Sequence, residues 1–173
     1  MYLEPINFVA MKENQIQIHY NIYKWEELSE SYKNLMDLSI AAQQNAYAPY
    51  SNFQVGAAIL LEDGTIFTGN NQENAAYPSG LCAERVAIFA CSAQHPNIKI
   101  KVIAICANSE KIDINTVLAP CGSCRQSMYE YESKQNTPIK VLLKGVDNEV
   151  VEFLSVADLL PLAFQCDGLK KVR

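Results

Sequence analysis

Two short cysteine motifs constrain this chain more than any other feature. The first is Cys-Ala-Glu-Arg at 82–85, and the second is Pro-Cys-Gly-Ser-Cys-Arg at 120–125; each opens a predicted helix. Zn²⁺ in a catalytic site takes three protein ligands and leaves a fourth position for water, and a Cys-x-x-Cys pair with one remote Cys meets that count. Cys82, Cys121 and Cys124 are therefore the candidate metal ligands, and the fold must bring two helix starts together.

The residues beside these cysteines have the chemistry that such a centre needs. Helix N-termini lower the pKa of a cysteine, and only a thiolate binds the metal, so the two helix starts favour three thiolates. Glu84 is poorly placed for a further ligand and well placed beside a metal-bound water, so we predict that it is the catalytic general acid and base. Three thiolates give a zinc centre a net negative charge. Arg85, which follows Glu84, is the candidate residue to offset that charge.

Composition excludes several classes of protein. The chain has 173 residues, 49% of them hydrophobic, which predicts one well-packed domain. With 14 Lys and Arg against 19 Asp and Glu, the net charge of −5 argues against a nucleic-acid partner. No apolar run is long enough to span a bilayer, and the N-terminus lacks the features of a signal peptide, so we expect no membrane partner and a cytoplasmic protein. In a reducing compartment the six cysteines favour metal or catalytic roles over disulfides.

Periodicity predicts a mixed α/β domain. Residues 16–23 alternate as a half-buried strand, with Ile16, Ile18, Tyr20 and Ile22 on one side, and we assign 1–24 to an N-terminal extension and 25–173 to the main domain. Met11 is an alternative first residue. The remaining pattern predicts helices at 25–47, 82–93 and 121–132, a hairpin of 53–61 and 65–71, and strands at 101–107, 139–144 and 149–153. Such an order indicates a mixed sheet with helices on its faces.

Two other classes of protein use a Cys-x-x-Cys motif. A structural zinc module would need four protein ligands, whereas only three cysteines here have ligand spacing. A thiol–disulfide oxidoreductase would need an exposed thiol of low pKa and no metal, so the zinc content distinguishes it.

A Cys-x-Glu followed by Pro-Cys-x-x-Cys is the signature of zinc-dependent deaminases, and this chain matches it completely. The chain resembles the free-nucleoside cytidine deaminases over roughly residues 30–170. The segments that carry the resemblance are Ala-Pro-Tyr-Ser-Asn-Phe at 48–53, Val-Gly-Ala-Ala at 55–58, Thr-Gly-Asn-Asn-Gln-Glu-Asn-Ala at 68–75, Tyr-Pro at 77–78, Gly-Leu-Cys-Ala-Glu-Arg at 80–85 and Leu-Leu-Pro-Leu-Ala-Phe at 159–164.

The resemblance implies a role for each substrate-binding residue. Asn71 and Glu73 match the pair that hydrogen-bonds the ribose 3′-hydroxyl, and Phe53 matches an aromatic residue that packs on the pyrimidine. Glu84 also matches the carboxylate that binds N3 of the base, and Arg85 the arginine beside the ligand sulfurs. The remaining matches are Ala83, whose backbone N–H meets the base carbonyl, and three residues that a neighbouring subunit supplies, namely Ala75, Tyr77 and Phe164.

The resemblance also implies the fold, the reaction and the assembly. The expected fold is a three-layer α/β/α sandwich of the cytidine deaminase type. The expected reaction is hydrolytic deamination of cytidine and deoxycytidine to uridine and deoxyuridine plus ammonia, in pyrimidine salvage, with one zinc ion per chain. Because family members with three cysteine ligands are homotetramers, a homotetramer with sites shared between subunits is implied. Nucleotides, polynucleotides and cytosine-containing antibiotics such as blasticidin S are the alternative substrates, although Glu73 at the sugar would repel phosphate.

Overall fold

One six-stranded sheet organises the chain. The computed structural model describes residues 12–109, 111 and 113–165, and it contains three α-helices and six strands within them. In chain order these are β1 (Tyr20–Lys24), α1 (Glu30–Gln43), β2 (Phe53–Leu61), β3 (Ile66–Asn70), α2 (Ala83–Gln94), β4 (Ile100–Ser109), α3 (Gly122–Gln135), β5 (Lys140–Lys144) and β6 (Glu149–Phe153). Short 3₁₀ turns lie at Trp25–Glu27, Tyr77–Ser79 and Val156–Leu159. None of these helices is long and apolar enough to cross a membrane.

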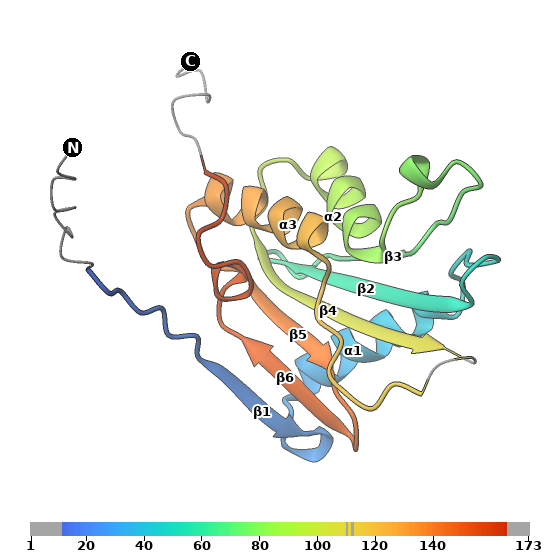
Figure 1. The fold of residues 1–173 in the computed structure, drawn as a ribbon, viewed down its shortest axis with the longest axis horizontal. Helices are drawn as coiled ribbons and strands as arrows, with labels where there is room; N and C mark the ends of the chain where they lie inside the picture. The colour runs from blue at the N-terminus through green and yellow to red at the C-terminus, as the bar shows by residue number, and fades with distance from the viewer. Residues whose placement is uncertain (1–11, 110, 112, 166–173) are drawn as a thin grey trace, which may run out of the picture.

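The sheet is mixed, as the periodicity predicted. Its strand order is β1-β6-β5-β4-β2-β3, in which β4 and β5 run parallel and every other neighbouring pair is antiparallel. The parallel pair is joined through α3, the crossover helix that a parallel connection requires (Figure 1). Each helix that begins with a cysteine motif thus connects two strands of the same sheet.

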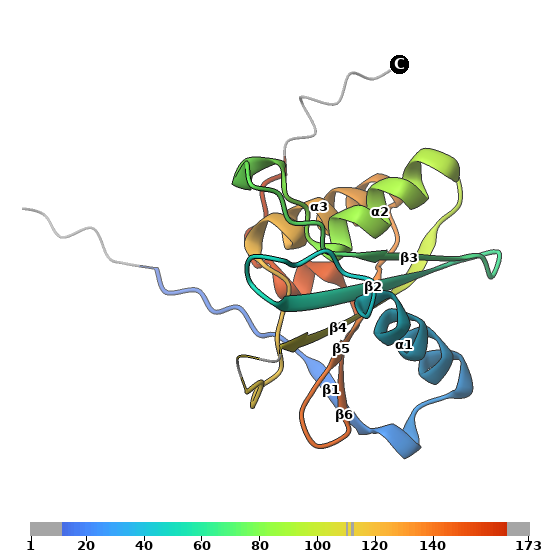
Figure 2. The ribbon, with the colours of Figure 1, turned by 90° about the vertical axis from the view of Figure 1, so that its right-hand side faces the viewer.

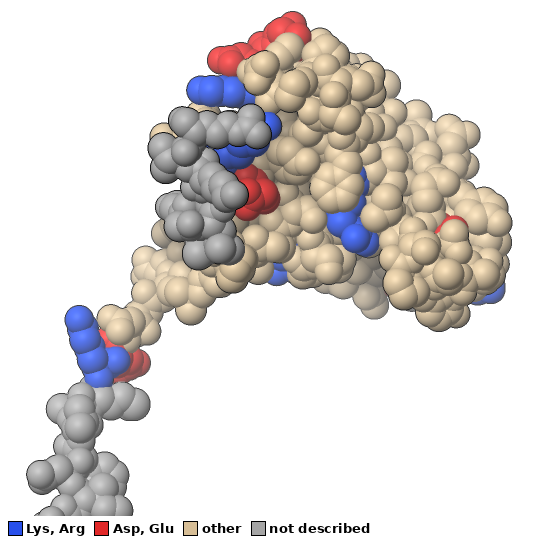
Figure 3. All heavy atoms as spheres, turned by 90° about the horizontal axis from the view of Figure 1, so that it is seen from above, with Lys and Arg blue, Asp and Glu red and all other residues tan. Residues whose placement is uncertain are grey.

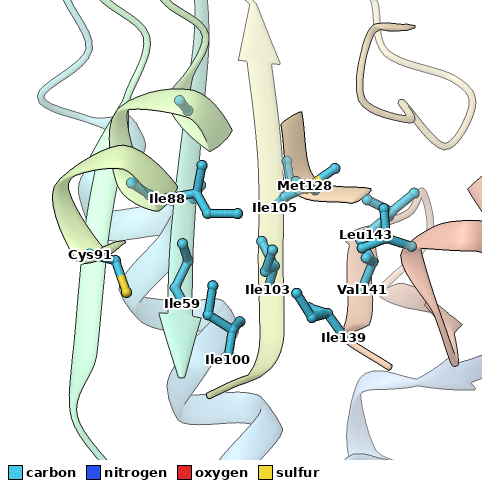
Figure 4. Packing of buried hydrophobic residues seen from close by; sticks show 14 of the residues in the cluster. Ile59, Ile88, Cys91, Ile100, Ile103, Ile105, Met128, Ile139, Val141 and Leu143 are labelled. Atoms are coloured by element: carbon cyan, nitrogen blue, oxygen red, sulfur yellow. The ribbon is translucent and has the colours of Figure 1, made fainter. Parts of the chain in front are cut away.

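Helices cover both faces of the sheet, so the three-layer α/β/α prediction is confirmed. Helices α2 and α3 lie side by side on one face, and α1 lies on the other (Figure 2). The core divides accordingly. The larger cluster, between the sheet and α2 and α3, includes Ile88 and Cys91 of α2, Met128 of α3, and Ile103 of β4 (Figure 4). The smaller cluster places Leu35 and Met36 of α1 against the opposite face.

Two glycines allow helices to approach the sheet closely. A Cβ atom on Gly56 of β2 would lie 2.0 Å from the carbonyl oxygen of Ser39 in α1. A Cβ atom on Gly69 of β3 would lie 2.6 Å from the backbone nitrogen of Ala87 and 2.9 Å from the carbonyl oxygen of Ala83, both in α2. Because no real Cβ atom tolerates such distances, Gly69 fixes the depth at which the first turn of α2 rests on the sheet.

The first helix is shorter than predicted. It begins at Glu30 rather than at Trp25, because the Ser29 side chain accepts a hydrogen bond from the Tyr32 backbone N–H at 3.3 Å and so caps the helix there. Residues 25–27 form a separate 3₁₀ turn. The other helices and the strands from β2 to β6 agree with the prediction to within about three residues at each end.

The N-terminal strand also differs from the prediction. It covers Tyr20–Lys24 rather than 16–23, because its partner β6 has only five residues and offers no pairing to residues before Tyr20. The four side chains expected to be half-buried are instead exposed, with 43–59% of their surface accessible to solvent: Ile16, Ile18, Tyr20 and Ile22. The possible start at Met11 lies outside the described residues, and the boundary between residues 24 and 25 stays a prediction.

A buried carboxylate attaches β1 to the rest of the domain. Glu152 of β6 accepts hydrogen bonds from Asn21 and Tyr23 of β1 at 3.0 and 3.1 Å, and from Tyr32 of α1 at 3.0 Å. The Lys140 ammonium group lies 3.2 Å from the same carboxylate. Burial opposes ionisation of Glu152, but these hydrogen bonds outweigh it and the pKa of the carboxyl group is lowered.

Candidate active site

The two cysteine motifs meet where α2 and α3 begin. Cys82 is the N-cap residue of α2 and Cys121 that of α3, both with extended backbone, and Cys124 lies in the first turn of α3. The three sulfur atoms lie within 4.8 Å of one another, and the Sγ atoms of Cys121 and Cys124 are 3.6 Å apart. Neither N-cap thiol accepts a capping hydrogen bond, so both sulfurs are available to a ligand at the positive ends of two helices.

Protonation of Cys82 depends on that of Cys124, because the two thiols share a hydrogen bond. The hydrogen bond from the Cys124 thiol, followed by the charge and hydrogen bond of Arg85, lowers the pKa of Cys82 to about 5. Because Cys124 donates the proton in that pair, its own pKa is raised. A soft divalent cation would take the place of these shared protons, and three thiolates are a donor set that zinc accepts. The cluster therefore fits zinc on its geometry and on its chemistry.

Glu84 lies in the first turn of α2 and is nearly inaccessible to solvent, with 5% of its surface exposed. Burial is the main reason why its pKa is raised, and the negative charge of Cys82 acts in the same direction. Its Oε2 atom has no hydrogen-bond partner, and among the described side chains the only other such buried atom is Nε of Arg85. A native structure rarely leaves a buried carboxylate oxygen unpaired, so this atom is open to a hydrogen bond from a water molecule or a substrate.

A cleft of about 480 Å³ lies beside the cysteines. Its wall is formed by residues before β2, by the loop between β3 and α2, and by the start of α2: Tyr50, Ser51, Asn71, Gln72, Glu73, Asn74, Tyr77, Gly80, Leu81, Cys82 and Arg85. Of the substrate-binding residues expected from the sequence, the structure places Asn71, Glu73 and Tyr77 on this wall. Arg85 is the only cationic side chain among the described residues that form it.

The polar residues expected at the sugar are already held by hydrogen bonds. Asn71 donates from Nδ2 to the Phe53 carbonyl oxygen and accepts at Oδ1 from the Val55 backbone N–H, both at 2.8 Å. These bonds fix the amide against the start of β2, where Phe53 is half-buried. The Asn71 Nδ2 group keeps one further N–H donor, and its Oδ1 atom keeps one further lone pair, for hydrogen bonds to a ligand.

Ser51 is a site residue for which the sequence analysis assigned no role. Its hydroxyl group donates to Oε1 of Glu73 and accepts from the Phe53 backbone N–H, the latter at 3.0 Å. The Ser51 hydroxyl is also the main reason why the pKa of Glu73 is lowered. Ser51 therefore connects two predicted substrate contacts, and its place in the segment 48–53 was the only signal in the sequence that could have identified it.

The other predicted contacts differ in exposure. Ala83 is fully buried at the start of α2. The three residues expected to serve a neighbouring subunit are exposed in the single chain: Ala75, Tyr77 at 79% and Phe164 at 71%. Ala75 and Phe164 do not line the cleft of their own chain.

Comparisons with known proteins agree with this geometry. Residues 29–137 match the family model described as the cytidine and deoxycytidylate deaminase zinc-binding region. The chain is 37% identical to a cytidine deaminase of Halalkalibacterium halodurans over 135 residues, which cover 78% of this chain and 95% of that protein. It is 38% identical to a cytidine deaminase of Mycobacterium tuberculosis over 136 residues, covering 76% of this chain and 88% of the relative.

Solved structures are similar as well. A crystal structure of cytidine deaminase from Burkholderia pseudomallei superposes with a TM-score of 0.64 at 39% identity, covering 76% of this chain and 97% of that one. The structure of the Mycobacterium tuberculosis cytidine deaminase superposes with a TM-score of 0.60 at 32% identity, covering 78% and 98%.

Proposed function

Because this chain belongs to the zinc-binding cytidine and deoxycytidylate deaminase family, we propose that it deaminates cytidine and deoxycytidine hydrolytically, releasing uridine or deoxyuridine and ammonia. One observation carries the proposal. Glu84, a buried carboxyl group with one unpaired oxygen, lies in the first turn of α2, two residues after Cys82, and it interacts with Cys82 and Cys124 of the sulfur cluster. A proton-transfer group and a metal-binding group are thus adjacent, and one of the metal-binding residues, Cys82, lies on the wall of the cleft.

The three thiolates would hold one zinc ion per chain, which as a Lewis acid would lower the pKa of a water molecule and so supply the nucleophile at neutral pH. Glu84 would accept the proton of that water and donate it to N3 of the pyrimidine as C4 is attacked. The same carboxyl group would then assist the departure of ammonia. Its raised pKa suits this exchange, because a carboxyl group in a dry site gains and releases a proton closer to neutral pH.

The remaining residues would bind and orient the nucleoside. Asn71 and Glu73 would hydrogen-bond the ribose 3′-hydroxyl, Phe53 would pack on the base, and the Ala83 backbone N–H would meet the base carbonyl. Arg85, which donates to Cys82, would offset the negative charge of the thiolates.

An uncharged substrate fits the cleft best. Glu73 is the carboxylate of its described wall, and Arg85, its only described cation, is already engaged with Cys82. A 5′-phosphate would therefore face a negative charge and find no free cation. Nucleosides are accordingly the proposed substrates, ahead of nucleotides and polynucleotides.

We propose that the active enzyme is a homotetramer whose sites are completed by Ala75, Tyr77 and Phe164 of a neighbouring copy. Tyr77, Leu162 and Phe164 are exposed by 79%, 92% and 71%, and large side chains left this open on one protein favour a contact with another. The face above α2 and α3 carries mainly uncharged residues (Figure 3), which would suit such a contact. A role in pyrimidine salvage and a cytoplasmic location complete the proposal; the five described cysteines are free thiols, as a reducing compartment favours.

The test is ammonia release from a panel of cytosine compounds. We expect turnover of cytidine and deoxycytidine, and at least ~10²-fold lower kcat/KM for the 5′-monophosphates and for blasticidin S, the cost of a few kcal/mol for an unmatched charge. The Glu84→Gln protein is the control for contaminating deaminases. A preference for deoxycytidylate over deoxycytidine would refute the substrate assignment while leaving the family unchanged.

A further inference from the structure

Side chains of α3 hold the end of the last 3₁₀ turn and the segment that follows it. Arg125 donates from Nη1 to the Leu159 carbonyl oxygen at 2.8 Å, and Tyr129 donates to the Gln165 side chain at 2.8 Å. Between these two contacts Gln126 reaches Phe164. The helix that begins at the candidate metal ligands Cys121 and Cys124 therefore also determines where the C-terminal segment lies.

Gln126 binds both backbone groups of Phe164. Its Nε2 donates to the Phe164 carbonyl oxygen at 3.0 Å, and its Oε1 accepts from the Phe164 N–H at 3.2 Å. This is the pairing that a neighbouring strand would make, with a side-chain amide in place of a peptide. Two hydrogen bonds to the backbone of one residue fix its position and the direction of its Cα–Cβ bond, from which the ring extends.

The Phe164 ring has few contacts with its own chain. It is exposed by 71%, so it has little packing on its own chain that could orient it. Leu162, two residues earlier, has a φ of 56° and is exposed by 92%. A bulky residue keeps such a conformation only where the surrounding structure holds it, and the hydrogen bonds from α3 to Leu159 and Phe164 hold the chain on either side of Leu162.

We propose that Gln126 is a positioning residue for the deamination reaction: it holds Phe164 in the orientation in which the ring covers the pyrimidine bound to a neighbouring copy. The inference rests on the proposed function, which assigns Phe164 to a neighbour's site. In this arrangement the start of α3 supplies metal ligands to the site of its own chain. About one turn further along, Gln126 of the same helix positions the Phe164 ring that enters the site of a neighbouring copy.

The decisive variant is Gln126→Met, which keeps the length of the side chain and removes both hydrogen bonds. The matched control is Gln94→Met at the far end of α2, which loses a single side-chain bond to the Ala90 carbonyl oxygen. We expect Gln126→Met to raise KM for cytidine about 10-fold, with kcat changed less than about 2-fold, because a misplaced ring weakens substrate binding more than it slows chemistry. Zinc content and Tm should equal those of the control. Gln126→Ala is a second variant without new bulk.

A double-mutant cycle tests whether Gln126 acts through Phe164. In a Phe164→Ala background, Gln126→Met should raise KM by less than about 2-fold, since the ring that it positions is already gone. If the two effects instead multiply, Gln126 acts by another route and the proposal is overturned.

Hydrogen exchange tests the contact without reference to activity. The Phe164 amide should exchange at least about 10-fold faster in Gln126→Met than in the wild type, and no faster in Gln94→Met, because its acceptor has been removed. Unchanged exchange overturns the proposal. If Phe164→Ala leaves KM unchanged, the assignment of Phe164 in the proposed function fails; if Phe164→Ala raises KM and Gln126→Met does not, only the present inference fails.

Discussion

The Nη2 atom of Arg85, in the first turn of α2, lies 3.6 Å from the Sγ atom of Cys82, the N-cap residue of the same helix. Each group favours the charged form of the other: hydrogen bonding to Cys82 raises the pKa of Arg85, and Arg85 contributes to the lowered pKa of Cys82. A guanidinium group in this position reduces the negative charge that three thiolates would place around a metal ion.

Arg85→Gln should therefore keep zinc and lose turnover. Without the positive charge, the water activated at the metal is harder to ionise, so the acid limb of the kcat–pH profile should move to higher pH. Arg85→Lys is the matched control, since it restores the charge and should recover part of the shift. If the pH profile of Arg85→Gln is unchanged, the dipoles of α2 and α3, and not Arg85, offset the negative charge of the thiolates.

Glu84→Gln should lower kcat by at least ~10²–10⁴, the usual contribution of a positioned acid or base. The zinc content, measured by elemental analysis, should stay near one per chain, because Glu84 is not a ligand. Glu62→Gln, at an exposed position in the turn after β2, is the control and should be fully active. Near-normal turnover by zinc-loaded Glu84→Gln would exclude the proposed proton transfers.

Removing a cysteine of the cluster should remove the metal together with the activity. Cys121→Ala or Cys124→Ala leaves two thiolates, too few for a stable tetrahedral centre, so the purified protein should contain well under one zinc per chain. Cys106→Ala is the control, because Cys106 is buried in the smaller core cluster. The Cys106→Ala protein should keep its zinc. A metal-free wild-type preparation with full activity would contradict the entire mechanism.

Complementation between inactive chains tests whether Phe164 serves a neighbour. Phe164→Ala should weaken substrate use by at most about 3–5 kcal/mol, the range for truncating a buried Phe, while zinc stays bound. Mixed and reassembled with Glu84→Gln chains, it should give more activity than the sum of the parents, because some sites then receive intact Glu84 and intact Phe164 from different chains. If native mass spectrometry shows that hybrid oligomers have formed and they recover no activity, Phe164 contributes only to the structure of its own chain.

Glu152 should make stability depend on pH. Its folded-state pKa is lowered, so its contribution is present above the unfolded value of about 4.5 and is lost as the pH falls through the folded value. Glu152→Gln should reduce the free energy of unfolding at pH 7 by about 1.5–3 kcal/mol, the range for hydrogen bonds to a charged group. The difference from wild type in urea denaturation should shrink toward pH 3, and an equal loss at both pH values would contradict the argument.

The sequence predicted those parts of the molecule that depend on neighbouring residues. Helix starts at Cys82 and Cys121, and the hairpin at Glu62-Asp63-Gly64, follow from local patterns, so the cysteine cluster and the three-layer fold were accessible. The start of α1 was missed because the helical periodicity begins at residue 25, whereas the side chain of Ser29 caps the helix and so sets its first residue at Glu30.

Contacts between distant segments could not be predicted in the same way. Alternation continues back to Ile16, but a strand needs a partner, and β6 is long enough only for residues 20–24. The Ser51–Glu73 and Gln126–Phe164 hydrogen bonds join residues that only the folded chain brings together.

The position of β1 in the sheet has a consequence for how the chain folds. Its partner is β6, and the bonded pair Asn21 and Glu152 is separated by 131 positions. During synthesis β1 leaves the ribosome before the other five strands of the described sheet, yet its partner β6 is made only when nearly the whole domain has been synthesised. Such long-range pairing is slow, because the chain between the partners must be ordered first. We therefore expect the earliest strand to emerge to be the last to join the sheet.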